Sequence, residues 1–107
     1  MESLLSKINT RMNYISSNTD NAYITKQLNT IKIKLQEIKE RKYSTQEGLD
    51  YVCNRIINYD IMNMKGVNGQ TNMVYKKMQE LSDFVEQIKT IYFATGEDTS
   101  VEETVEE

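Results

Sequence analysis

Apolar residues recur three and four positions apart along almost the whole chain, and this is the spacing of one buried face of an α-helix. The 107 residues include no proline, so no position forbids a helix. Four such stretches are separated by short polar segments, and we expect helices at about residues 3–16, 22–42, 45–65 and 72–94. The sequence therefore predicts an all-α fold: a small bundle of three to four amphipathic helices with coiled-coil-like packing, in one domain over residues 1–96.

The stretch from Ser44 to Lys65 is predicted to be the central helix, because apolar residues follow two of its sides. Ser44 and Glu47 have the spacing of a capping box at its start, and Gly66 follows its last turn. A helix that is apolar on two sides is expected to have neighbours on both. The main stripe is Leu49, Val52, Cys53, Ile56, Ile57, Ile61 and Met64, and the second stripe is Tyr51, Arg55, Tyr59 and Met62.

The other three stretches each carry one narrow stripe with alternating spacings of four and three, as in the seam of a coiled coil. The stripes are Leu5, Ile8, Met12 and Ile15; then Ile24, Leu28, Ile31, Leu35 and Ile38; then Val74, Met78, Leu81, Val85, Ile88 and Tyr92. A narrow stripe buries little in a monomer, so two arrangements remain open: a bundle with its core complete, or helices completed by another chain. In the second arrangement the candidate interface is Met78, Leu81, Phe84, Val85, Ile88, Ile91 and Tyr92.

The net charge of −3 is divided unevenly along the chain. From Thr95 onward there are six acidic residues and no basic one: Glu97, Asp98, Glu102, Glu103, Glu106 and Glu107. The other ten acids face thirteen bases, so the body carries +3. Residues 97–107 offer only Val101 and Val105 to a core, and we expect a disordered acidic tail that is dispensable for folding. Such a tail is either solubilising or an imitation of nucleic-acid phosphate towards a basic partner.

Several kinds of chemistry lack the residues they need. There is no histidine, which removes the commonest acid–base catalyst and metal ligand. The single cysteine, Cys53, cannot form an internal disulfide and has no histidine to activate it, so we interpret it as a core side chain. No phosphate-binding loop, dinucleotide fingerprint or metal-ligand cluster is present. We therefore expect no enzymatic activity, no catalytic or metal-binding residues and no cofactor.

Asp60 is the candidate buried polar residue. It falls inside the main apolar stripe and near the end of the central helix, where the helix dipole disfavours an anion. If it is buried, it needs a cation from another helix or chain; otherwise it lies at the solvent edge.

The segment after the central helix carries two weaker signals. Residues 66–69 match the GxxG spacing of nucleic-acid-binding KH domains, but no strand-like segment accompanies them and a turn is the favoured interpretation. Methionines gather near this loop, either as core filling or as an adaptable binding patch. They are Met62, Met64, Met73 and Met78.

The basic residues of the second stretch are a candidate nucleic-acid face, namely Lys32, Lys34, Lys39, Arg41 and Lys42. They are spread around the predicted helix and interleaved with Glu37 and Glu40. A solvated surface is therefore the favoured interpretation.

The sequence favours a non-enzymatic protein–protein interaction or assembly module, either a homo-oligomer or a protein with one protein partner. No apolar run is long enough to span a membrane and no signal peptide is evident, so we expect a cytoplasmic protein. Asn, Ile, Lys and Tyr make up 38 of the 107 residues, a bias typical of AT-rich genomes. This bias suggests a phage or mobile-element protein, and its function in that setting would be to inhibit or regulate a host protein. The alternative is a nucleic-acid-associated accessory protein that uses the basic residues of the helix at 22–42.

Overall fold

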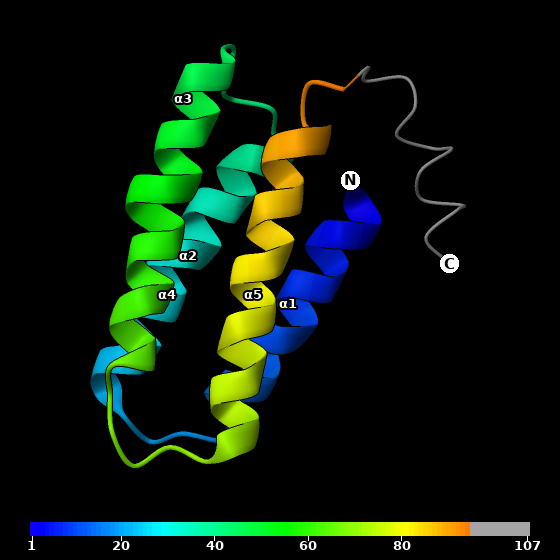
Figure 1. The fold of residues 1–107 in the computed structure, drawn as a ribbon. Coiled ribbons are helices and arrows are strands. Elements are labelled where there is room, and N and C mark those ends of the chain that lie inside the picture. The colour runs from blue at the N-terminus through cyan, green and yellow to red at the C-terminus, as the bar shows by residue number, and fades with distance from the viewer. Residues whose placement is uncertain (95–107) are drawn as a thin grey trace.

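The computed structural model describes residues 1–94, and these form an all-α bundle, as predicted (Figure 1). Each helix runs antiparallel to the one before it, and the described part of the chain contains no strand. The helices are α1 (Glu2–Ser17), α2 (Ala22–Lys39), a third helix made of α3 (Gln46–Tyr51), η1 (Val52–Ile57) and α4 (Asn58–Lys65), and finally α5 (Asn72–Ile91).

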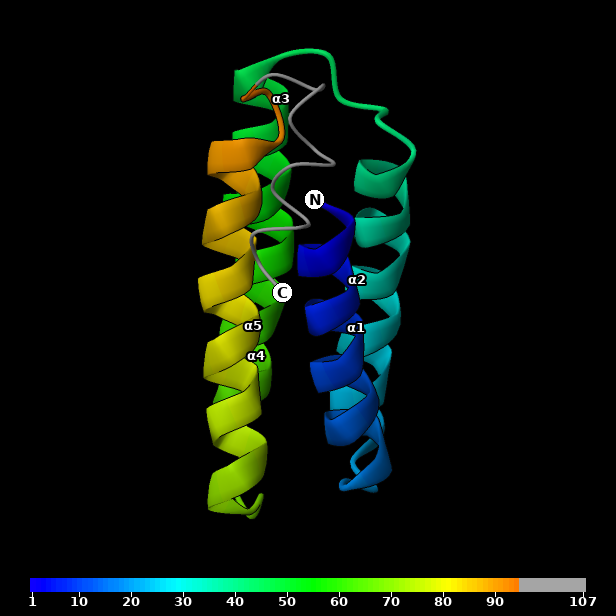
Figure 2. The same ribbon diagram turned by 90° about the vertical axis from the view of Figure 1, so that its right-hand side faces the viewer.

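The four helices are arranged as a closed bundle. α1 packs against α2 and α5, and the third helix packs against the same two helices from the opposite corner (Figures 1 and 2). α1 and the third helix are therefore diagonal to each other, as are α2 and α5. Each helix has two neighbours, which cover its inner face and both flanks. Its outer face points away from the bundle.

The core is made from one stripe of each helix. The stripes predicted for α2 and α5 are buried in full, from Ile24 to Ile38 and from Val74 to Tyr92. In α1 the prediction is wrong at one position. Leu4 is buried and Leu5 is only partly buried, because the face of α1 that points to the core carries Leu4, Ile8, Met12 and Ile15. The buried residues of the third helix are Leu49, Val52, Cys53, Ile57, Ile61 and Met64, while Ile56 is partly buried.

Side-chain caps start three of the helices. Asn21 accepts a hydrogen bond from the amide of Ile24, and Thr71 accepts one from the amide of Val74. The cap of α3 is Thr45, one residue later than predicted, and its hydroxyl accepts from the amide of Gly48 at 3.0 Å. The capping box predicted from Ser44 is therefore wrong. It is Thr45 that adopts the extended backbone of a cap, and Glu47 then lies one position too early for the reciprocal bond.

The connection from α2 to α3 is tied to the end of α5. Arg41 has a positive φ of 60°, which ends α2 at Lys39, before the expected boundary. Its guanidinium lies 4.6 Å from the ring centroid of Tyr92 and donates to the carbonyl of that residue. The Tyr92 hydroxyl accepts from the amide of Tyr43 and donates to its carbonyl, and the Tyr43 hydroxyl donates to Glu37. These contacts fix the end of α5 beside the α2–α3 connection.

Candidate interaction surface

The stripe of α5 proposed from the sequence as an interface is part of the core. Met78, Leu81, Val85, Ile88 and Tyr92 are buried by the other helices of the same chain, so they are not accessible to a partner. Only two members of the candidate set are partly exposed. Phe84 packs against the core with the Arg11 guanidinium 5.1 Å from its ring centroid, and Ile91 packs against the core as well. The prediction of an exposed row here is wrong, because α1 covers the side of α5 that was expected to remain open.

The second stripe of the third helix has the opposite environment. Tyr51, Tyr59 and Met62 are exposed at 60%, 56% and 65%, and Arg55 between them is exposed too. The sequence predicted a neighbour on this side, and no residue of the described chain supplies one. We call Tyr51, Arg55, Tyr59 and Met62 the outer stripe.

Contacts on both flanks of the third helix explain why this stripe faces away from the bundle. On one flank, Asn58 donates to Glu86 at 2.9 Å and Asn54 accepts from Lys89 at 2.7 Å, which joins the helix to α5. The other flank packs against α2 and carries the partly buried Ile56 and Asp60. The outer stripe lies between these two flanks, on the side of the helix opposite the core.

A π-helical turn lies behind the outer stripe. In η1 the amide of Asn58 donates to the carbonyl of Cys53, five residues earlier, instead of four as in an α-helix. Residues spaced by four overshoot one α-helical turn by about 0.4 residue, and a wider turn corrects that overshoot. Tyr51, Arg55 and Tyr59 are spaced by four across η1, so the π turn brings them closer to a straight row. π turns are rare, and they occur frequently at functional sites.

The outer stripe consists of residue types that are common at protein interfaces. Tyr, Arg and Met are enriched at interfaces, and Tyr and Arg dominate binding hot spots. Within residues 1–94, Arg55 forms no ion pair and neither Tyr51 nor Tyr59 forms a hydrogen bond, so all three polar ends remain available.

Asp60 is partly buried, not fully buried. Burial raises the pKa of its carboxyl above the usual value, and no cation among the described residues pairs with it. Asp60 therefore lies between the two predicted positions, on the flank of α4 towards α2.

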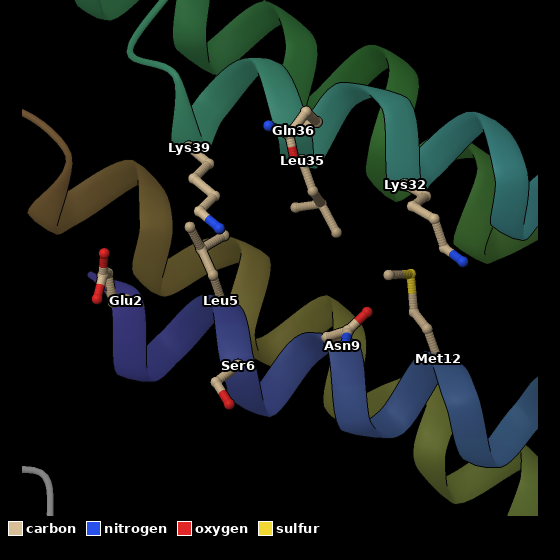
Figure 3. Close-up of a pocket in the computed structure, with 9 residues that line it drawn as sticks. All are labelled: Glu2, Leu5, Ser6, Asn9, Met12, Lys32, Leu35, Gln36 and Lys39. Atoms are coloured by element: carbon tan, nitrogen blue, oxygen red, sulfur yellow. The ribbon is translucent and has the colours of Figure 1, made fainter.

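The basic residues of α2 do not form one face. Lys34 pairs with Glu37 at 3.4 Å, and Lys42 pairs with Glu40 at 3.3 Å. Arg41 is engaged with Tyr92. Lys32 and Lys39 lie on a different side of α2, towards α1 (Figure 3). The candidate nucleic-acid face is thus divided among three environments.

A groove of about 550 Å³ lies between α1 and α2. Figure 3 shows Lys32, Leu35 and Lys39 directed from α2 towards α1, with Leu5 and Met12 directed towards α2. Sequence reasoning did not identify this site, although the seven-residue spacing of Lys32 and Lys39 was a signal that they share a face. The groove is lined by Glu2, Leu5, Ser6, Asn9, Met12, Lys32, Leu35, Gln36 and Lys39.

The cysteine, the glycine turn and the methionines singled out from the sequence lie in the core, in a turn or at separate surface positions. Cys53 is buried, and burial raises the pKa of its thiol to about 12, so it carries no nucleophilic thiolate at neutral pH. Gly69 has a φ of +88° in the turn before α5. Met64 and Met78 are buried, whereas Met62 and Met73 are exposed at 65% and 44%. The methionines therefore do not form a single patch.

Comparison of the chain with protein-family models, with curated proteins and with solved structures finds no match in any of the three. Within residues 1–94, no helix has the length and apolar character needed to cross a membrane.

Proposed function

We propose that this chain is a non-enzymatic protein–protein interaction module whose docking surface is the outer stripe of the third helix. The observation that carries the proposal is the exposure of Tyr51, Tyr59 and Met62 in one row, with Arg55 among them. Single exposed apolar residues are common on protein surfaces. Three large ones in a single row along one helix, with Arg55 on the turn between Tyr51 and Tyr59, are the pattern of an interface.

The occupant that fits this row best is a second copy of the same chain. In an antiparallel pair related by a two-fold axis, Tyr51 of one copy faces Met62 of the other, and Arg55 faces Tyr59. The symmetry repeats each contact, so two guanidinium groups stack on two tyrosine rings, a favourable cation–π geometry. The row is narrow, so such a dimer buries an area at the low end of the range for specific interfaces and dissociates readily.

Sedimentation velocity over a concentration series tests this proposal. We expect the wild-type chain to shift from monomer to dimer as concentration rises. Tyr59→Ala should weaken the dimer by at least about tenfold, as expected for an aromatic hot spot. Tyr23→Ala is the matched control, because Tyr23 is also an exposed tyrosine, at 45%, but lies on α2.

Two outcomes would contradict this proposal, one concerning the location of the interface and one concerning its occupant. Equal weakening by both variants would contradict the assignment of the interface to the outer stripe. A wild-type chain that remains monomeric throughout would contradict a second copy as the occupant. The basic residues of α2 point in different directions, so we do not propose a nucleic-acid function.

A further inference from the structure

The groove between α1 and α2 combines two cations with an apolar floor. Lys32 and Lys39 extend over it from α2, and Leu5, Met12 and Leu35 line it between them (Figure 3). Leu35 and Met12 belong to the buried core, so the floor of the groove is the edge of that core. Glu2 is the one anion in the lining, at the end of the groove where α1 begins. Such a groove suits an extended peptide that carries both carboxylates and small apolar groups.

The two lysines are available for a ligand. Within the described residues, neither Lys32 nor Lys39 forms an ion pair or a hydrogen bond. The other cations near this end of α2 are engaged, Lys34 with Glu37 and Lys42 with Glu40. The pair in the groove is thus the part of the basic surface of α2 that the bundle does not use.

The acidic segment at the end of the sequence has a matching pattern. Its last four acids form two pairs, Glu102–Glu103 and Glu106–Glu107, with Val101 and Val105 beside them. In an extended chain the two pairs are about 13 Å apart. Lys32 and Lys39 are two helical turns apart, or about 10.5 Å along α2. Each acidic pair can therefore meet one lysine.

The chain also leaves the bundle at the end where Lys39 and the start of α1 lie. Arg41 follows Lys39 by two residues and contacts Tyr92 at the end of α5, so the chain leaves α5 at the same end of the bundle as Lys39. Figure 1 shows the start of α1 there as well. Glu102 is the eighth residue after Ala94, a reach of about 26 Å when extended. Neighbouring helices are about 8–10 Å apart and diagonal ones, such as α5 and α2, are roughly 11–14 Å apart, so the segment is long enough.

We propose that the α1–α2 groove is the docking site for residues 97–107 of the same chain. Lys39 faces Glu102 and Glu103, Lys32 faces Glu106 and Glu107, and the valines lie against Leu5 and Leu35. The attraction is between exposed charges, so it weakens as salt is added. The site is separate from the outer stripe.

Paramagnetic relaxation in the full-length chain tests the proposal. A nitroxide is attached to Thr104→Cys, and Cys53 remains unlabelled because it is buried and its thiol pKa is about 12. We expect broadening of the amide signals of Asn9, Lys32 and Gln36, which should persist on dilution. The same chain with a reduced, diamagnetic label provides the reference intensities.

A charge-reversal pair identifies the groove as the cause. Lys32→Glu with Lys39→Glu should reduce the occupancy of the groove about fivefold, the effect expected for two exposed ion pairs. Lys26→Glu with Lys76→Glu is the matched control, since both of these lysines are exposed on other surfaces. It changes the net charge equally and should leave the broadening in place.

Three results would overturn the proposal. The first is no broadening at groove residues in the parent chain. The second is an equal loss with both double variants, which would indicate attraction to the overall charge and not to the groove. The third is broadening that disappears on dilution, which would show that the segment docks on another copy.

Discussion

The stripe of α5 and the outer stripe of the third helix both place large side chains in a row along one helix face, but their environments in the structure are opposite. From Val74 to Tyr92 the α5 stripe is buried. Tyr51, Tyr59 and Met62 of the outer stripe are more than half exposed. The difference is topological, because a closed four-helix bundle buries one face of each helix. A helix with a second apolar face therefore has that face left over, and the bundle has no element to cover it.

The largest expected effect is a difference in the free energy of unfolding between two truncations to alanine, one in each stripe. Leu81→Ala should lower the free energy of unfolding by about 2–5 kcal/mol, because it leaves a cavity in a fully buried site. Tyr59→Ala should leave it within about 0.5 kcal/mol, since the ring is exposed. Urea denaturation of both variants, followed by circular dichroism, measures the difference. A loss for Tyr59→Ala as large as that for Leu81→Ala would show that the outer stripe is also core.

The polar end of the α5 stripe should contribute less than its apolar part. Tyr92→Phe keeps the buried ring but removes the hydroxyl that bonds to the amide and carbonyl of Tyr43. We expect a loss of about 1–2 kcal/mol in the free energy of unfolding. Chemical denaturation provides this value as well. An unchanged stability would mean that water replaces the hydroxyl and that the α2–α3 connection is not held by this bond.

Asp60, on the flank of the third helix towards α2, should show a small effect that depends on pH. Burial raises the pKa of Asp60 in the folded state above its unfolded value near 3.8. The folded protein therefore loses stability as pH rises through the folded-state pKa, and the penalty is fully present at neutral pH. Asp60→Asn should raise the melting temperature at neutral pH and lose this advantage below about pH 3.8. A stabilisation that is the same at both pH values would contradict the assignment to the carboxylate charge.

The sequence allowed much of the core to be predicted and less of the site. The 4–3 spacings of Ile24 to Ile38 and of Val74 to Tyr92 identified buried faces correctly, because one unbroken apolar stripe dominates each of those helices. The spacing could not show that α1 covers Phe84, since that depends on how the helices pair. Thr45 and Ser44 are equally good caps by residue type, so only the backbone distinguishes them. The π turn had one indication, the repeated spacing of four from Leu49 to Ile61, which drifts around an ideal α-helix.

The rate of methionine oxidation by hydrogen peroxide tests the central claim most directly, since methionine is oxidised where the reagent can reach it. Met62 lies in the outer stripe, Met78 lies in the α5 stripe, and Met73 is an exposed reference outside both. At low protein concentration we expect Met62 and Met73 to oxidise at similar rates, with Met78 much slower. At high concentration Met62 should become protected while Met73 does not. Oxidation of Met78 as fast as Met62 would contradict the core assignment. A rate for Met62 that never changes with concentration would contradict the proposed interface.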